Sequence, residues 1–371
     1  MQNPFKYGQI VTGSDFCPRP ELIRQLEEHI KSGQNIVVYG ERRVGKSSAV
    51  YRAAVNSKPR KPLLIDFMGV KSTDALIKRI LKALIAQKDK QGTMMSILKK
   101  FAAIRPTVSL DPVTSMPGLS FDASLEIKAE SISEVIELIK ELYGDKKVVV
   151  IMDEFQDILD LPDPKEAFAI MRASIQYQTN IPYIFVGSIR HKMDSIFVNN
   201  DSPFFKSAIP IEVEPIPKDE FVAFIKNKLT EGKRKISAGS FNQIFEITGN
   251  IPGDVQQLCE ALWSVTKEKE SIASDQIKKA MELIFSRERN AYENYVRLIT
   301  GMQMKSLVAI AGRSGKNIFS IEFMKAAGFN NASSLRRCIN RLIDLNILFN
   351  YKGEYRFVNP FFRAWILTGL S

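Results

Sequence analysis

Residues 40–47 read GERRVGKS (Gly40 to Ser47) and follow NIVVYG (Asn35 to Gly40), an apolar run typical of a buried strand. The octapeptide matches G-x-x-x-x-G-K-[ST], in which a glycine-rich turn joins a strand to a helix and surrounds a phosphate with backbone N–H groups. Gly40 and Gly45 allow backbone geometry and a close approach that a Cβ would obstruct. The stretch therefore predicts a phosphate-binding loop at the start of a helix.

The same loop predicts which atoms hold ATP or ADP. Lys46 is expected to neutralise the β- and γ-phosphates, and the Ser47 hydroxyl to bind Mg²⁺. The candidate nucleotide contacts are Gly40, Glu41, Arg42, Arg43, Val44, Gly45, Lys46, Ser47 and Ser48. The alternative is an ordinary strand–turn–helix, or a degenerate loop that no longer binds a nucleotide.

A second apolar run, KVVVIMDEF (Lys147 to Phe155), ends in two carboxylates. Asp153 is expected to hold Mg²⁺ directly or through water. Glu154 is expected to polarise the water that attacks the γ-phosphate, which makes it the candidate catalytic base. The alternative is a pair of solvated loop carboxylates.

A third run, PYIFVGS (Pro182 to Ser188), places a hydroxyl at another strand end. In a parallel sheet this end faces the phosphates, so Ser188 is expected to orient the attacking water. Arg190 follows closely, either as a cation that stabilises transition-state charge or as an ordinary surface arginine.

The first half of the chain alternates such runs, including PLLIDFM (Pro62 to Met68), with helical patterns. Continuous apolar strands between helices predict a parallel sheet covered on both faces, an α/β fold of the P-loop type. One insertion, Arg105 to Ala123, has two short alternating segments around a Pro/Gly-rich turn and predicts a β-hairpin.

After PIEVEPIP (Pro210 to Pro217) the strand patterns stop, and residues 218–290 are helical in pattern, with N-caps expected at Asp219, Ser240, Asp254 and Ser274 or Asp275. Three further helical patterns and a hairpin in ILFNYKGEYRFV (Ile347 to Val358) follow, which is the winged-helix order. The predicted domains are a core over 1–216, a helical lid over 217–290 and a winged helix over 291–371.

Composition excludes several classes of protein. The 371 residues are 45% hydrophobic and 25% charged, as in a globular protein, and no apolar run is long enough to span a bilayer. Three scattered cysteines and two histidines exclude a disulfide framework and a zinc cluster, so a reducing cytoplasm is expected. The net charge is +11, and residues 286–371 alone hold 13 Lys+Arg against 5 Asp+Glu. This asymmetry favours a nucleic-acid or acidic partner there, the alternative being a basic solvated surface.

With these motifs in this order, the chain resembles the AAA+ ATPases, specifically the STAND-like branch often called archaeal-type ATPases, over nearly its whole length. FCPRPELIRQL (Phe16 to Leu26) is similar to the leading F-x-x-R-x-x-E-L element of that family, which borders the adenine. The resemblance therefore implies base contacts from Phe16, Cys17 and Pro18.

Two later segments carry the resemblance further. EITGNIPGDVQQL (Glu246 to Leu258) is similar to the G-x-P signature of the family lid, which implies that Pro252 lies near the adenine or ribose. No arginine occurs between Arg234 and Arg287, so the sensor-2 arginine of other AAA+ proteins is absent. NPFFRAWIL resembles the terminal D-P-x-F-x-x-W motif of the winged-helix module, with Asn359 in place of the aspartate.

The winged helix offers a candidate nucleic-acid face. A helix over about 334–345 turns its apolar positions inward and presents Arg336, Arg337, Asn340 and Arg341 on its other side. Arginine and asparagine suit guanine and adenine edges in the major groove, and Lys352 at the wing tip is placed for phosphates. The alternative is a module that packs on the core or contacts a protein partner.

These inferences favour a slow, Mg²⁺-dependent ATPase that acts as a molecular switch, with nucleotide state controlling the lid, the winged helix and self-association. An ATP-regulated DNA-binding protein of initiator or regulator type, and a nucleotide-binding scaffold without turnover, are the alternatives. The expected partners are a nucleotide, then DNA, a protein or a second copy, and no membrane.

Overall fold

The computed structural model describes residues 2–87, 107–110, 117–120, 129–144 and 147–369. The chain divides into two compact units. The core unit runs from Arg19 to Glu214, and the helical unit combines residues 1–18 with residues 215–371. The chain therefore crosses from one unit to the other twice, at Pro18–Arg19 and at Glu214–Pro215.

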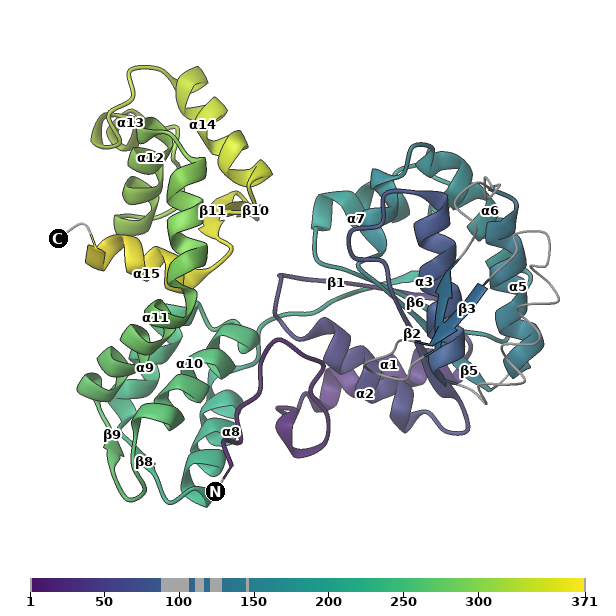
Figure 1. The fold of residues 1–371 in the computed structure, drawn as a ribbon, viewed down its shortest axis with the longest axis horizontal. Coiled ribbons are helices and arrows are strands. Elements are labelled where there is room, and N and C mark those ends of the chain that lie inside the picture. The colour runs from purple at the N-terminus through teal and green to yellow at the C-terminus, as the bar shows by residue number, and fades with distance from the viewer. Residues whose placement is uncertain (1, 88–106, 111–116, 121–128, 145–146, 370–371) are drawn as a thin grey trace. The chain divides into compact units, whose positions relative to one another are not determined.

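A five-stranded parallel sheet forms the centre of the core unit, in the order β2-β5-β6-β1-β7 (Figure 1). Its strands are β1 (Ile36–Tyr39), β2 (Lys61–Asp66), β5 (Val148–Asp153), β6 (Tyr183–Gly187) and β7 (Ile209–Glu212). Each apolar run predicted to be a strand contains one, so the expected α/β fold with a parallel sheet is confirmed.

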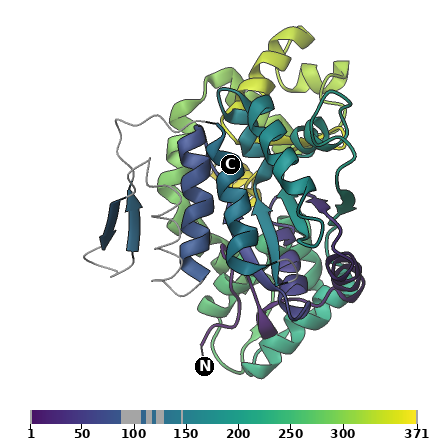
Figure 2. The same ribbon diagram turned by 90° about the vertical axis from the view of Figure 1, so that its right-hand side faces the viewer.

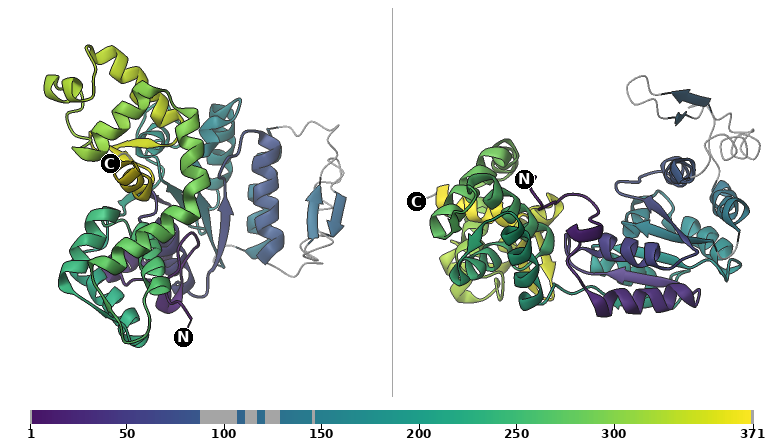
Figure 3. Two further views of the ribbon diagram at one scale, coloured as in Figure 1. Left: turned by 60° about the vertical axis from the view of Figure 1, so that its left-hand side comes forward. Right: turned by 90° about the horizontal axis from the view of Figure 1, so that it is seen from below.

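Helices cover both faces of this sheet, because its strands are apolar on both sides. On one face lie α1 (Pro20–Lys31) and α2 (Lys46–Asn56), and on the other α3 (Thr73–Gln87), α5 (Ser131–Tyr143) and α6 (Pro164–Gln176) (Figure 3). Successive side chains of β5 point to opposite faces of the sheet. Val150 and Met152 join the hydrophobic cluster beneath α3, α5 and α6, whereas the equally buried Val149 and Ile151 do not.

The parallel order brings three of the predicted site segments to one edge of the sheet. Tyr39 at the end of β1 lies beside Gly187 at the end of β6, so Gly40 and Ser188 leave neighbouring strands together. β5 is the next strand along, with Met152 beside Phe185, and it delivers Asp153 to the same edge. This carboxyl edge is where ligands bind in open parallel sheets.

The predicted hairpin is also present. β3 (Thr107–Leu110) and β4 (Pro117–Ser120) form an antiparallel pair of their own, with Thr107 opposite Ser120 (Figure 2). The rest of the predicted insertion, at 105–106, 111–116 and 121–123, lies outside the described residues.

The first part of the helical unit consists of four helices, as the sequence predicts for residues 218–290. They are α8 (Lys218–Glu231), α9 (Ala238–Thr248), α10 (Pro252–Val265) and α11 (Ser274–Leu298). Two-residue strands β8 (Lys235–Ile236) and β9 (Ser271–Ile272) pair in parallel beside them.

The predicted N-caps of these helices are wrong, because each helix begins earlier than its expected capping residue. The N-cap positions are held by Pro217, Ser237, Ile251 and Ala273. In α9 the Ser237 hydroxyl accepts the N–H of Ser240 at 3.3 Å, so the earlier of two serines caps the helix. Asp219 and Asp254 lie instead in the first turn, where a carboxylate interacts favourably with the helix dipole.

Residues 2–18 pack in the helical unit, although the predicted core domain begins at residue 1. The Phe5 ring meets the Trp263 ring edge-on, with 6.3 Å between centroids. The Lys228 ammonium, which is buried, donates to the Pro4 carbonyl and to an Asp15 carboxylate oxygen, each at 2.9 Å. These long-range contacts are not visible in the sequence. The division into 1–216, 217–290 and 291–371 stays a prediction.

The last part of the helical unit has the predicted winged-helix order. Its elements are α12 (Gly301–Gly312), α13 (Ile321–Ala326), α14 (Ala332–Asp344), β10 (Leu348–Tyr351), β11 (Glu354–Phe357) and α15 (Pro360–Gly369). β10 and β11 form an antiparallel hairpin whose turn contains Lys352 and Gly353, both at positive φ.

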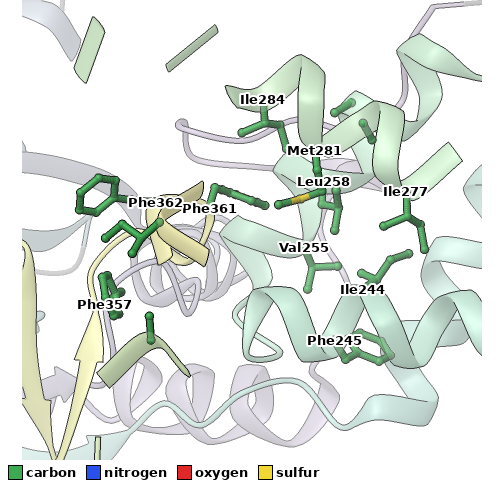
Figure 4. Packing of buried hydrophobic residues seen from close by; sticks show 14 of the residues in the cluster. Ile244, Phe245, Val255, Leu258, Ile277, Met281, Ile284, Phe357, Phe361 and Phe362 are labelled. Atoms are coloured by element: carbon green, nitrogen blue, oxygen red, sulfur yellow. The ribbon is translucent and has the colours of Figure 1, made fainter. Parts of the chain in front are cut away.

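The lid helices and the winged helix share one hydrophobic core. α11 runs without a break through residue 290, where the predicted domain boundary falls. Phe361 and Phe362 of α15 belong to the same cluster of buried side chains as Leu258 of α10 and Met281 of α11 (Figure 4). The two predicted domains therefore form a continuous packed body.

A polar bridge reinforces this junction. Glu288 of α11 accepts a hydrogen bond from the Gln257 side chain of α10 at 2.5 Å and one from the Asn359 side chain at 2.7 Å. The Asn359 carbonyl oxygen in turn accepts the N–H of Phe361 at 2.9 Å and so starts α15. Asn359 thus links the winged helix to the lid.

Candidate nucleotide-binding site

The phosphate loop has the backbone geometry that its two glycines allow. Gly45 adopts φ 94° and is the N-cap of α2, so the loop turns directly into the helix N-terminus. A Cβ on Gly40 would lie 2.5 Å from the Val213 carbonyl oxygen, nearer than atoms can pack. Gly40 is thus required because the Val213 carbonyl, just after β7, leaves no room for a Cβ. Gly45 is required because the turn into α2 needs a positive φ.

Lys46 lies within this loop as a buried cation. Only 6% of its surface is exposed, and its ammonium donates to the carbonyls of Gly40 at 3.1 Å and Glu41 at 2.8 Å. Burial lowers the pKa of Lys46 to about 8, against the opposing effect of the Glu154 and Asp153 carboxylates. A buried ammonium held by neutral carbonyls is a strong site for phosphate oxygens, which would compensate its charge.

The other named loop residues line the same turn. Glu41, Val44 and Ser48 are buried, whereas Arg42 and Arg43 are exposed and Arg43 has φ 62°. The loop therefore presents two guanidinium groups on its outer side and one ammonium inside.

Ser47 and Asp153 form the candidate Mg²⁺ site. The Ser47 side chain hydrogen-bonds the Asp153 carboxylate, and burial raises the pKa of Asp153 against that hydrogen bond. A hydroxyl beside one buried carboxylate fits Mg²⁺, which typically takes one or two protein oxygens and completes its shell with phosphates and water. Within the described residues no group of three or more His, Cys, Asp or Glu side chains could hold a metal.

Glu154 follows Asp153 and is held by two neighbours. Its backbone is left-handed, at φ 49°, directly after the last residue of β5. The Ser188 hydroxyl donates to Glu154 Oε2 at 2.9 Å, and the Gln156 amide donates to the same oxygen. The structure thus brings together the predicted catalytic pair, Glu154 and Ser188, and adds Gln156.

Gln156 is a further residue at this carboxylate that the sequence motifs do not indicate. It is 1% exposed, and its amide nitrogen donates to Asp157 at 3.1 Å as well as to Glu154. A Cβ on Gly187 would lie 2.7 Å from the Gln156 side-chain oxygen, so the glycine before Ser188 makes room for this amide. A polar residue two positions after the carboxylate pair was the available signal.

Arg190 is engaged elsewhere at the same edge. Its guanidinium pairs with the Glu212 carboxylate of β7 at 3.0 Å and lies over the Tyr39 ring, 5.1 Å from its centroid. In this conformation Arg190 therefore neutralises a strand-end carboxylate.

Two sequence-family models match the chain. The model described as an ATPase domain predominantly from Archaea matches residues 16–258, more than half of the chain. The chain belongs to this ATPase family. A second model, described as a probable winged helix domain, matches residues 290–368. The resemblance inferred from the motifs is confirmed.

Solved structures share the fold of this ATPase. The Walker-type ATPase PABY2304 of Pyrococcus abyssi is 21% identical, with a TM-score of 0.64 over 95% of this chain and 96% of its own. The Aeropyrum pernix ORC1 protein, solved in complex with DNA, is 13% identical, with a TM-score of 0.55 over 97% and 96%. At these identities the likeness establishes the fold alone. No curated protein matches the chain in sequence.

The base-contact candidates of the ATPase belong to the helical unit. Cys17 is buried in its hydrophobic cluster, between the half-buried Phe16 and the exposed Pro18, and Pro252 is the buried first residue of α10. The phosphate loop belongs to the core unit. A joint role of the two sets around one nucleotide stays a prediction.

The nucleic-acid candidates lie together on the winged helix. Arg336, Arg337, Asn340 and Arg341 are exposed on α14, whose inner side buries Leu335, Ile339 and Leu342. Arg336 lies over the Phe319 ring, 5.2 Å from its centroid, and Lys352 is exposed at the tip of the β10–β11 turn. The geometry provides an exposed basic helix face, and its partner stays a prediction.

Among the described residues, none of the helices combines the length and the apolar composition that crossing a bilayer requires.

Proposed function

We propose that this archaeal-type ATPase is a slow, Mg²⁺-dependent molecular switch that binds and hydrolyses ATP and transmits its nucleotide state to the lid and winged helix. The observation that carries the proposal is the constellation at the carboxyl edge of the sheet. There Lys46 is buried in the phosphate loop, Ser47 contacts Asp153, and Glu154 contacts Ser188.

ATP binding would supply the negative charge that the buried Lys46 ammonium lacks among its hydrogen-bond partners. The phosphates of ATP would take over the Lys46 ammonium from the carbonyls of Gly40 and Glu41, restoring a full opposite charge to a buried cation. Ser47 and Asp153 are the residues that would hold Mg²⁺. Bound there, Mg²⁺ would neutralise the charge that develops on the phosphate oxygens.

Hydrolysis would depend on Glu154. Its carboxylate accepts a proton from water as the water oxygen attacks the γ-phosphorus, while the bond from that phosphorus to the β–γ bridging oxygen breaks and ADP leaves. Both the Ser188 and the Gln156 hydrogen bonds fall on Oε2. These two hydrogen bonds would hold the carboxylate in one orientation and leave Oε1 available to the attacking water.

The switch role is supported by the packing of the helical unit. α11 is continuous between lid and winged helix, and Glu288 bridges Gln257 to Asn359. A nucleotide-dependent change in the lid would therefore be passed to the winged helix without an intervening hinge. Self-association or a protein partner would be the readout of this change.

The decisive experiment compares Lys46→Ala and Glu154→Gln with the wild type. Phosphate release and ATP binding are measured separately, with Mg²⁺ and with a chelator. Lys46→Ala should lose binding, whereas Glu154→Gln should bind ATP and lose about 100-fold or more in turnover. A wild type that binds ATP but never turns over, with or without DNA, supports the scaffold alternative and contradicts the switch by hydrolysis.

A second candidate function, ATP-regulated DNA binding, is favoured by one observation. The 13 Lys+Arg against 5 Asp+Glu in residues 286–371 coincide with the exposed basic face of α14. If this function holds, duplex binding falls steeply with salt and changes between the ATP and ADP states. Absence of binding even at low salt contradicts it.

A further inference from the structure

Arg19 is a buried arginine that the proposed mechanism does not use. It stands at the N-cap of α1 but makes no side-chain capping bond there, and only 9% of its surface is exposed. Its guanidinium instead donates to two backbone carbonyls, Val44 at 2.7 Å and Glu214 at 2.8 Å. The three residues are far apart in sequence, so the guanidinium ties three chain segments together.

The first of these carbonyls belongs to the phosphate loop. Val44 directly precedes Gly45, the left-handed residue that turns the loop into α2, and Lys46 follows. The Arg19 guanidinium lies close enough to Gly45 that a Cβ there would be 3.9 Å from Nη2. Its hydrogen bond fixes the orientation of the Val44–Gly45 peptide, whose N–H belongs to the row that would face phosphate.

The second carbonyl lies where the chain leaves the core. Glu214 is the last residue of the core unit and Arg19 is the first, so one side chain joins both crossing points. The preceding residue, Val213, donates its N–H to Tyr39 at 2.8 Å and presses its carbonyl against Gly40. The segment that follows β7, Val213–Glu214, therefore contacts the start of the loop, and Arg19 links that segment to the end of the loop.

A second buried arginine shows what a purely structural role looks like. Arg234 also donates to backbone carbonyls, those of Gly232 and Thr266 at 2.9 to 3.0 Å, and its guanidinium lies 3.8 Å from the Trp263 ring centroid. All of its partners belong to the helical unit. Arg19 differs because its two carbonyls belong to the candidate site and to a crossing point.

We propose that Arg19 is a positioning residue that couples occupancy of the phosphate loop to the two segments through which the core unit joins the helical unit. The inference rests on the proposed nucleotide site and identifies a route by which nucleotide occupancy would affect the segments that connect the two units. Phosphate binding orders the Val44–Gly45 peptide, the guanidinium stays bonded to both carbonyls, and residue 214 is held with it. Without phosphate the loop end is looser, and so is the crossing.

The test uses the full chain and backbone hydrogen exchange, with Mg²⁺ and either ADP or a non-hydrolysable ATP analogue. In the wild type, nucleotide should slow exchange in the loop, 40–48, and in the crossing segments, 16–22 and 211–221. In Arg19→Ala the loop should still be protected at saturating nucleotide, but the crossing segments should lose their nucleotide-dependent protection. Its affinity should fall about tenfold, as expected when a hydrogen bond that orders the loop is lost.

Two further variants make the result decisive. Arg24→Ala removes an exposed arginine from the same helix, whose guanidinium donates to the side chains of Glu21 and Glu28, and should behave as wild type. Arg19→Lys keeps the charge but cannot span two carbonyls with a planar fork, so it should bind within about threefold of wild type and lose at least half of the protection at 211–221.

Full wild-type protection of 211–221 in Arg19→Lys or Arg19→Ala overturns the coupling, and a lowered melting temperature with that protection intact assigns Arg19 a structural role only. If Arg19→Ala does not fold, Arg19→Lys decides alone. A wild type that shows no nucleotide-dependent protection at 40–48 instead contradicts the proposed function, on which the coupling rests.

Discussion

The carboxyl edge of the core sheet and the outer face of α14 both gather charged side chains, but their charges are held differently. At the sheet edge, Lys46 and Asp153 are buried and each is fixed by neighbours whose geometry is specific. On α14, Arg336 and Arg341 are exposed above an apolar inner side. Buried charge is costly unless a defined partner compensates it, so Lys46, whose ammonium is held by neutral carbonyls, indicates an anionic ligand. Exposed charge identifies only a class of partner.

The largest expected effect breaks the buried site by adding a single methyl group. Gly40→Ala would place a Cβ 2.5 Å from the Val213 carbonyl oxygen, so the loop or the segment after β7 must shift. ATP affinity, measured by calorimetry, should fall by about 100-fold or more, since a displaced loop loses several charge-assisted contacts. Gly239→Ala is the matched control, because its Cβ would meet nothing within 4 Å. Wild-type affinity in Gly40→Ala would show that the loop tolerates displacement.

The exposed face should respond in another way. We expect Arg336→Ala, Arg337→Ala and Arg341→Ala together to weaken duplex binding by about two orders of magnitude and to reduce the slope of log affinity against log salt by about 3. ATP hydrolysis without DNA should not change. The control removes the same charge from exposed arginines elsewhere, Arg24, Arg289 and Arg297. An equal loss of duplex affinity in the control would show that α14 contributes only as part of a generally basic surface.

A third measurement follows the protonation of the buried lysine. Burial lowers the pKa of Lys46 to about 8, so the unliganded protein loses the Lys46 proton above pH 8. Above that pH, ATP binding requires Lys46 to take up a proton. Affinity should therefore fall by up to about tenfold per pH unit above 8. The unfolded chain keeps the proton to near the ordinary lysine pKa of 10.5, so the free energy of unfolding should rise with pH between about 8 and 10.5.

Lys46→Met is the control for this titration, since it keeps an unbranched side chain of similar length without the charge. Its unfolding free energy, from urea titrations, should lack that rise. An equal rise in both proteins would place the titrating group elsewhere.

The smallest effect concerns the junction between lid and winged helix. Asn359→Asp restores the aspartate of the family motif but sets a second carboxylate against Glu288, where the asparagine now donates at 2.7 Å. We expect a loss of about 1 kcal/mol of unfolding free energy at neutral pH. The repulsion raises the carboxyl pKa in the folded state, so the loss should shrink as pH falls toward 5. Asn359→Ala loses the donor without adding charge, and a loss independent of pH in both variants would contradict this account.

Much of the fold and part of the site follow from the sequence, for a local reason. The phosphate loop is specified by eight consecutive residues, and the buried strands by continuous apolar runs, so both patterns are complete within short windows. The edge that joins Gly40, Glu154 and Ser188 then follows from the parallel order alone.

What the sequence does not reveal depends on distant or conformational partners. The carbonyl that Arg19 holds at Glu214 is 195 positions away, so no local pattern indicates it. Gln156 is only two residues from Glu154, but its contact with the Glu154 carboxylate occurs beside a left-handed Glu154 backbone, a conformation that residues other than glycine seldom adopt. The N-terminal contact of Phe5 with Trp263 likewise depends on packing. Each of these required a three-dimensional structure.

The unbroken course of α11 has a mechanical consequence. A helix of 25 residues is about 37 Å long, at about 1.5 Å per residue. If its lid end were to tilt by about 10°, the end that enters the winged helix would sweep about 6 Å, roughly the rise of one helical turn. Because Glu288 fastens α15 to its middle, that sweep would carry the basic face of α14 as well. A small rearrangement beside the lid would therefore become, at α14, a displacement large enough to make or break a contact.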